Sequence, residues 1–283
     1  MARGKTIQIY LPDGNPQGAK IINIPDFPIK AILVPKNLIK ETNNLVNLKR
    51  MGIYFLFNEK EEEAKYKAYI GEGIILDRIS NHYRNKDDWN FAVCFYSDSE
   101  EGFNKSQITY LESHSINEAK DIGRVNLNNM KDQILPKISM PEKDLILRFF
   151  DELKIILGTL GYPIFEKIKK AESEEDIFYC KSDKAEASGN LTEEGFVVYA
   201  GSKANLEERP SANESIKALR KSLFERGVFE KKEDHFFIMD EVVFSSPSAA
   251  SMAMFGRSSN GWNDWKNKDG KTLDEIKRKE EED

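Results

Sequence analysis

The chain has 283 residues, of which 40% are hydrophobic and 32% are charged, so it can form two domains of ordinary size, each with its own core. Its net charge of −6 excludes a surface that binds polyanions all over, although a local basic patch is compatible with it. The histidines are scattered, and Cys94 and Cys180 lie in apolar segments without metal-ligand spacing, which argues against a zinc site. No apolar run reaches the roughly 18 residues of a membrane span, and no apolar signal core is present. We therefore expect a soluble, cytoplasmic protein that does not interact with membranes.

Positive charge is concentrated near the N-terminus. The residues up to Phe57 include eight basic and three acidic side chains, which gives this segment +5 and leaves −11 for the rest of the chain. The segment opens with strand-like alternation at Lys5–Tyr10 and contains a second apolar run at Ala31–Val34. We interpret residues 1–47 as a basic strand or arm, which either faces a phosphate backbone or carries solvated lysines.

Short apolar runs and helical patterns alternate along the middle of the chain. Strands are predicted at Gly52–Phe57, Ala68–Gly71 and Trp89–Tyr96. Helices are predicted at Ile74–Tyr83, Lys105–Ile122 and Glu142–Leu160. The polar stretch Glu59–Lys65, between the first two strands, is expected to be an exposed loop.

The pattern changes after the charged cluster Lys167–Asp176, which we interpret as a linker because it has no apolar period. Short strands are predicted beyond it at Ile177–Cys180, Phe196–Tyr199, Phe236–Met239 and Val242–Phe244. A helix capped by Ser246 is then expected to run to Phe255. The predicted organisation is an N-terminal segment (1–47), a first domain (48–135), a helix with linker (136–170) and a second domain (171–283).

Two tripeptides, Gly52-Ile53-Tyr54 and Tyr69-Ile70-Gly71, follow one another on neighbouring predicted strands, before a helix that carries Arg78. Each alone is an ordinary strand fragment, but in this order they resemble the GIY-YIG endonuclease family. The likeness covers residues 1–135 and continues through Glu72, Arg78, His82, Trp89 and Tyr110-Leu111-Glu112-Ser113. The C-terminal half resembles an uncharacterised domain commonly fused behind such nucleases, in the segments Phe244–Ala250 and Gly256–Trp262.

This resemblance implies a small antiparallel sheet flanked by helices, followed by a smaller α+β domain, so the expected fold class is α/β (α+β). It also implies a metal-dependent endonuclease that hydrolyses phosphodiester bonds in DNA, with Mg²⁺ or Mn²⁺ as the cofactor. The implied catalytic residues are Tyr54, Tyr69, Arg78, His82 and Glu112, of which Glu112 is the metal ligand. Which tyrosine is the general base stays open, and either Asn126 or Asn128 is expected to match a further polar residue of the site.

Phosphodiester hydrolysis needs an activated water, stabilisation of the charge on the phosphorane and help for the leaving oxygen. Two tyrosine hydroxyls at one edge of a hairpin can orient or deprotonate a water, although a phenol that titrates near 10 needs a nearby cation to act as a base. Arg78 is a candidate for that cation, and its planar guanidinium can also hold a phosphate through two hydrogen bonds.

Helical spacing groups the remaining candidates. Arg78 and His82 form an i, i+4 pair along one edge of an apolar arc, so both can reach one pocket. Glu112 falls beside the inward stripe of the later helix, and a carboxylate turned partly inward needs a partner such as a divalent cation. The stripe consists of Ile108, Leu111, Ser115, Ala119 and Ile122.

The gap between Gly71 and Arg78 is one residue shorter than in most relatives, and one residue corresponds to about 100° of helix. Either an altered turn at Gly73 brings Arg78 to the site, or Arg78 misses it. The alternative to an active nuclease is therefore a catalytically weak or inactive nuclease fold that binds DNA as a regulatory module. In that case Arg78 pairs with Asp77 or Glu72, and Glu112 pairs with a lysine.

Overall fold

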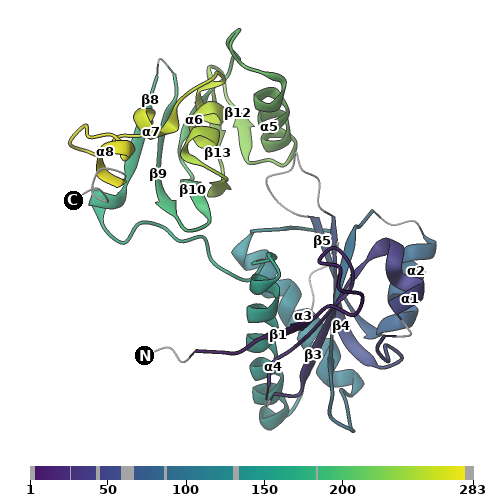
Figure 1. Ribbon diagram of the computed structural model, residues 1–283. Helices are drawn as coiled ribbons and strands as arrows, with labels where there is room; N and C mark the ends of the chain where they lie inside the picture. Colours follow the sequence, from purple (N-terminus) through teal and green to yellow (C-terminus); the bar gives the residue numbers. More distant parts are fainter. Residues whose placement is uncertain are drawn as a thin grey trace. The chain divides into compact units, whose positions relative to one another are not determined.

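The protein, analysed as a computed structural model, forms two compact units, whose boundary in the sequence follows Lys167 (Figure 1). Each unit contains a β-sheet with helices packed against it, which confirms the expected mixed α and β class. The described residues are 4–25, 27–42, 45–58, 67–85, 88–129, 134–182 and 184–277. The predicted loop Glu59–Lys65 lies outside them.

The first unit is built on a seven-stranded sheet in the order β1-β2-β3-β6-β4-β5-β7. Its strands are β1 (Gln8–Tyr10), β2 (Lys20–Asn23), β3 (Ile29–Pro35), β4 (Met51–Asn58), β5 (Lys67–Ile74), β6 (Phe91–Ser97) and β7 (Asn126–Leu127). The β5–β7 pair is parallel, whereas the other neighbouring strands pair antiparallel. The sheet is larger than expected because residues 1–47, interpreted as an arm, contribute β1, β2 and β3.

Helices cover both faces of this sheet (Figure 1). They are α1 (Ile39–Thr42), which follows a 3₁₀ turn at Lys36–Leu38, α2 (Ile75–Arg84), α3 (Lys105–Ile122) and α4 (Met140–Thr159). Because side chains alternate along β4, Phe55 faces the core beneath α3 and α4, while Tyr54 and Leu56 face the core beneath α2. A strand buried on both faces reads as a continuous apolar run, as Gly52–Phe57 does.

The chain from α4 to Phe165 completes the core of the first unit. Phe149 and Leu153 of α4 are buried there, together with Tyr162 and Phe165 beyond the helix. A capping box between Ser139 and Glu142 fixes the start of α4. Most of the segment 136–170 is therefore packed structure that belongs to this unit.

The second unit contains another seven-stranded sheet, in the order β12-β13-β11-β9-β10-β14, with β8 paired to β9. Its strands are β8 (Phe178–Lys181), β9 (Glu186–Thr192), β10 (Gly195–Val198), β11 (Lys203–Asn205), β12 (Phe229–Lys231), β13 (His235–Ile238) and β14 (Val242–Phe244). Its helices are α5 (Glu214–Glu225), α6 (Pro247–Phe255), α7 (Gly261–Asp264) and α8 (Leu273–Lys277), after a 3₁₀ turn at Glu174–Asp176.

Two buried side chains tie the helices of the second unit together. Trp265 is fully buried against Phe196, and its indole N–H donates to the carbonyl of Pro247 at 3.0 Å. The guanidinium of Arg220, on α5, donates to the carbonyls of Ala253 and Asn205, and so links this helix to α6 and β11. In the part of the chain that the structure describes, no helix has the length and hydropathy needed to cross a membrane.

We expect Phe55→Ala to lower the free energy of unfolding of the first unit by about 3–5 kcal/mol, because it opens a cavity in a packed core. The Phe55 ring is fully buried and lies 5.8 Å from that of Phe95 and 6.0 Å from that of Phe165, between ring centroids. Urea unfolding followed by circular dichroism measures the change. The control Leu145→Ala removes a side chain that is 50% exposed, and its effect should stay within about 0.5 kcal/mol. Equal effects of the two substitutions would contradict the described core.

Candidate active site at the edge of β5

The predicted site residues gather along the outer edge of β5, where alternate residues direct their main-chain groups away from β4. Ala68 pairs with β7 at this edge, and its carbonyl accepts a hydrogen bond from the N–H of Asn128. The side-chain amide of Asn129 bonds to the main chain of Ile70. Its oxygen accepts from the Ile70 N–H at 3.0 Å, and its nitrogen donates to the Ile70 carbonyl at 2.8 Å. At Glu72 the partners are two predicted site residues, Arg78 and Glu112.

Tyr54 and Tyr69 lie on the same face of the β4–β5 hairpin, the face that packs against α2. The register pairs Tyr54 with Gly71 and Leu56 with Tyr69, which places the two tyrosine rings 6.2 Å apart between centroids. The ring of Tyr54 lies across Gly71, where a β-carbon would overlap it. The last glycine of the second tripeptide therefore provides the space that the tyrosine of the first one occupies.

His82 completes an aromatic cluster with the two tyrosines. Its Nε2 lies 3.0 Å from the Tyr54 hydroxyl, and its ring centroid lies 5.0 Å from that of Tyr69. Tyr54 donates in this hydrogen bond when Nε2 carries no proton. His82 and Tyr69 are half-buried, whereas Tyr54 is only 1% exposed. Of the two phenols, Tyr69 is thus the one that can meet a substrate or a water.

The chemistry of Tyr54 follows from its burial. Burial raises the pKa of the Tyr54 hydroxyl well above its ordinary value, the neighbouring Tyr69 raises it further, and the Arg78 guanidinium only partly opposes this. Tyr54 consequently remains protonated near neutral pH. Its geometry suits a hydrogen-bonding partner that orients His82 better than a phenolate base.

A tight junction between β5 and α2 brings Arg78 to the site. Helix α2 has no side-chain cap, and its first N–H groups bond to the carbonyls of Arg50 and Leu48. Gly73 has a φ of +136°, which favours glycine, and a β-carbon there would lie 3.1 Å from Nε of Arg78. Gly73 thus leaves room for the Arg78 side chain to lie against the edge of β5.

Arg78 then donates from Nε to the main-chain carbonyl of Glu72 at 3.0 Å, while its side chain remains exposed. It lowers the pKa values of both Tyr54 and Glu112, and is therefore close to both residues. Because Tyr54 and Glu112 lie on opposite faces of the sheet, Arg78 joins the two halves of the site around the edge of β5.

Glu112 belongs to a small charged cluster on the α3 face of the sheet, with Glu72 and Lys105. The pKa of Glu112 is raised to about 7, first by burial and then by the Glu72 carboxylate, while the charges of Lys105 and Arg78 and the nearby Glu72 N–H partly oppose the rise. Lys105 pairs with one oxygen of the Glu72 carboxylate, and Glu72 is only 5% exposed. The predicted inward stripe of α3 is buried at Ile108, Leu111, Ser115 and Ala119, as expected.

The donors of this cluster fit a divalent cation. Oxygen ligands suit Mg²⁺ and Mn²⁺, and the second oxygen of Glu72 is buried without a hydrogen-bond partner among the described residues. No group of three or more His, Cys, Asp or Glu side chains that could hold a metal ion occurs in the described part of the chain. Two carboxylates, Glu72 and Glu112, are thus what this site offers to a cation.

Sequence reasoning missed three of these residues: Glu72 as a buried acid, its partner Lys105, and Asn129. The alternation of side chains along the strands contained a signal for Glu72. Glu72 pairs with Ile53, whose side chain is buried in the core beneath α3 and α4, so the Glu72 side chain faces the same side of the sheet. No local pattern marks Asn129. Of the two asparagines expected near the site, Asn126 pairs with Lys67 in the sheet, and Asn128 meets Ala68 through its main chain.

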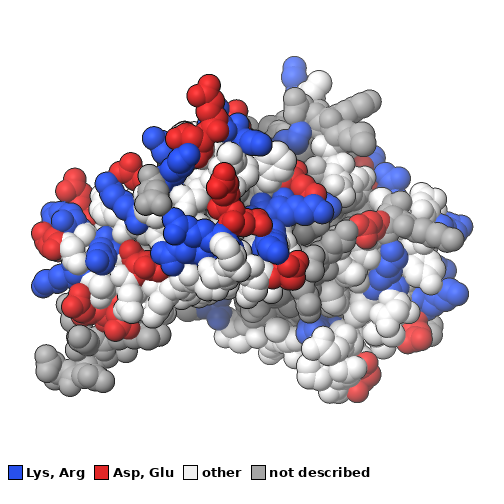
Figure 2. All heavy atoms as spheres, turned by 90° about the horizontal axis from the view of Figure 1, so that it is seen from above, with Lys and Arg blue, Asp and Glu red and all other residues white. Residues whose placement is uncertain are grey.

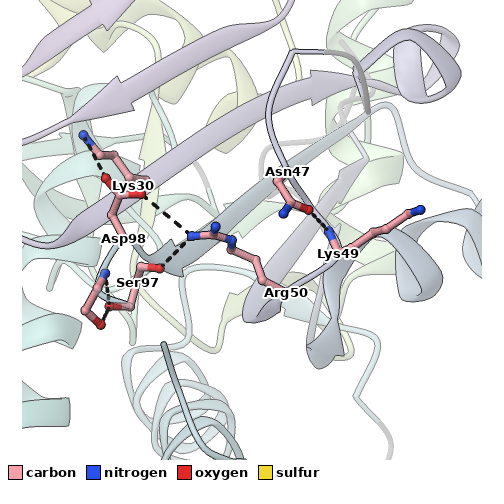
Figure 3. Close-up of polar contacts among 7 residues, drawn as sticks. Lys30, Asn47, Lys49, Arg50, Ser97 and Asp98 are labelled. Carbon is pink, nitrogen blue, oxygen red and sulfur yellow. Dashed lines mark hydrogen bonds and ion pairs between the residues drawn. The ribbon is translucent and has the colours of Figure 1, made fainter. Parts of the chain in front are cut away.

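The basic N-terminal segment is partly neutralised within the fold. Figure 3 shows Lys30 and Arg50 turned toward Asp98, with N···O distances of 3.7 and 3.8 Å, and Arg50 also donates to the Ser97 carbonyl at 3.1 Å. The side chain of Lys49 is exposed and points away from Asp98. On the face in Figure 2, basic and acidic side chains are interspersed.

Comparison with known proteins identifies the second unit alone. Residues 178–277, from β8 to α8, match the family model described as "Domain of unknown function (DUF4357)". No curated protein and no solved structure matches the chain. These comparisons do not test the resemblance of residues 1–135 to GIY-YIG endonucleases, which rests on the sequence motifs.

We expect Glu112→Gln to stabilise the protein at about pH 8 and to have little effect near pH 5. With a pKa raised from 4.5 to about 7, Glu112 binds its proton more tightly in the folded state, so its contribution to stability falls as pH rises through that range. The Gln side chain carries no charge at any of these pH values, so the variant does not lose this stability as pH rises. Melting temperatures across the range should differ by at least about 2 °C at the upper end. A difference that does not change with pH would contradict the buried position of Glu112.

Proposed function

We propose that the first unit is a metal-dependent endonuclease that hydrolyses phosphodiester bonds in DNA. The observation that carries this proposal is the gathering of Tyr54, Tyr69, Arg78, His82 and Glu112 around one sheet edge. Each residue type has a part in such a reaction, and the order of the motifs along the chain resembles that of GIY-YIG nucleases. The five residues come from four elements, β4, β5, α2 and α3, so a structural role common to all of them offers no simpler account.

In this proposal Arg78 binds the scissile phosphate. The Nε–H of Arg78 donates to the Glu72 carbonyl, and this bond fixes the orientation of the guanidinium. The two terminal nitrogens are then directed to the phosphate oxygens in this proposal. Because the side chain is exposed, a DNA strand can approach it without rearrangement of the sheet. The fixed positive charge also stabilises the phosphorane.

Tyr69 and His82 handle the attacking water. The half-buried Tyr69 hydroxyl orients the water. Nδ1 of His82 receives the proton of that water, in the tautomer in which the Nε2–H donates to the Tyr54 hydroxyl oxygen. Tyr54 holds His82 through the hydrogen bond at 3.0 Å. The raised pKa of Tyr54 favours this positioning role and makes Tyr54 the weaker candidate for the base.

Glu112 holds the cation, with Mg²⁺ or Mn²⁺ the expected ion. A bound cation of this kind supplies stabilisation of the charge that develops on the phosphate and the leaving oxygen. In the second unit, the DUF4357 domain is proposed to position the substrate or a partner, since it lies outside the residues that form the site.

A second candidate function, a DNA-binding regulatory module without turnover, is favoured by one observation. The ammonium of Lys105 pairs with Glu72 beside Glu112, so a side-chain cation already partly neutralises the acidic cluster. Such a module would keep the phosphate contact of Arg78 and would bind DNA without a metal ion.

We expect the purified protein to nick supercoiled plasmid DNA in the presence of Mg²⁺ or Mn²⁺ and to lose this activity in EDTA. Glu112→Gln should slow nicking by at least about 100-fold, since it removes several kcal/mol of charge stabilisation. His82→Ala should slow it by about 100-fold or more, as expected for a general base. Gel electrophoresis of time points measures the rates.

The matched control is Glu118→Gln, which makes the same change on α3, about 9 Å further along the helix axis. It should nick at the wild-type rate. Activity that survives in Glu112→Gln would contradict the assigned site. A folded protein that retards DNA without nicking it under any of these conditions would support the regulatory module instead.

A further inference from the structure

We propose that Glu72 is a second carboxylate ligand of the cation held by Glu112, and that Lys105 is an internal counterion that this cation displaces. The inference rests on the proposed function, because it adds a ligand and a competing side chain to the same site. It changes the expected ligand set from one carboxylate to two.

The first argument is the burial of Glu72. The residue is 5% exposed, one of its carboxylate oxygens pairs with Lys105, and the other is buried without a hydrogen-bond partner among the described residues. A buried carboxylate oxygen without a partner is costly, and a cation is the group that removes this cost most completely. The acid therefore has more capacity for positive charge than one ammonium supplies.

The second argument is the contact between Glu72 and Glu112. The Glu112 carboxylate lies close to the main-chain N–H of Glu72, and the two carboxylates are close enough to repel each other. Two like charges are held together at this point by the edge of β5 and by the packing of α3 against the sheet. A divalent cation between them converts this repulsion into two attractive contacts.

The third argument is the position of Lys105. It is the first residue of α3, and its side chain is 64% exposed although the carboxylate that it contacts is buried. An exposed lysine side chain can turn into solvent without opening the core. Lys105 can thus neutralise the acids when no metal ion is bound and leave when one arrives.

The test is Mn²⁺ binding to the full-length protein without DNA, measured by the loss of the free-ion signal in electron paramagnetic resonance. The wild type should bind one Mn²⁺, and Glu72→Gln and Glu112→Gln should each weaken binding by at least about tenfold, because the number of charged ligands sets affinity in such sites. Lys105→Gln should strengthen binding several-fold, since it removes the competing charge. Melting curves establish that each variant is folded.

Two control variants keep the result interpretable. Glu118→Gln and Lys120→Gln repeat the charge changes on α3, the second about 22 Å from Lys105 along the helix axis, and both should bind Mn²⁺ like the wild type. Wild-type affinity in Glu72→Gln, with binding lost in Glu112→Gln, would overturn the role of Glu72 and leave the proposed function standing. Unchanged affinity in Lys105→Gln would overturn the displacement. A wild type that binds no Mn²⁺ would overturn the two-carboxylate site, while plasmid nicking would still decide the proposed function.

Discussion

The outer edge of a β-sheet exposes main-chain N–H and C=O groups that need partners, and β5 meets this requirement in three ways along a few residues. The short parallel strand β7 pairs with the first position, Ala68, and the side-chain amide of Asn129 bonds to the main chain of the second, Ile70. At the third position, Glu72, the guanidinium of Arg78 donates to the carbonyl, and the carboxylate of Glu112 lies close to the N–H. The groups that complete the sheet are therefore the groups from which the proposed chemistry is built.

In the proposed reaction, this arrangement lets residues from both faces of the sheet act at one place. Tyr54, Tyr69 and His82 lie on the α2 side, whereas Glu72 and Glu112 lie on the α3 side. Only at an uncovered edge can both sets reach the same substrate. The hydrogen bond from Arg78 to the carbonyl of residue 72 links the two sets, and the glycines on the α2 face leave space for the Tyr54 ring and the Arg78 side chain. A change in the main chain at Glu72 would thus disturb binding of phosphate and of metal ion together.

Much of the first unit could be predicted from sequence, because its elements have strong local signals. The α3 helix was predicted at its observed bounds, since Asn104 caps it and Gly123 ends it in the left-handed conformation. The size of the sheet was not predicted, because pairing of β3 with β6 joins residues far apart in the sequence. The same limit applies to the site. Helical spacing placed Arg78 beside His82, but the bond from Arg78 to Glu72 depends on the φ of Gly73, and the pairing of Lys105 with Glu72 depends on how α3 packs.

Amide hydrogen exchange at Glu72, followed by NMR, tests most directly the claim that the edge of β5 unites fold and site. The N–H of Glu72 should be protected in the wild type and should exchange much faster in Glu112→Ala, which removes the carboxylate close to it. The N–H of Ile70, which the Asn129 amide holds, should keep its protection in both proteins. Rapid exchange of the Glu72 amide in the wild type, or equal protection in the variant, would contradict the account.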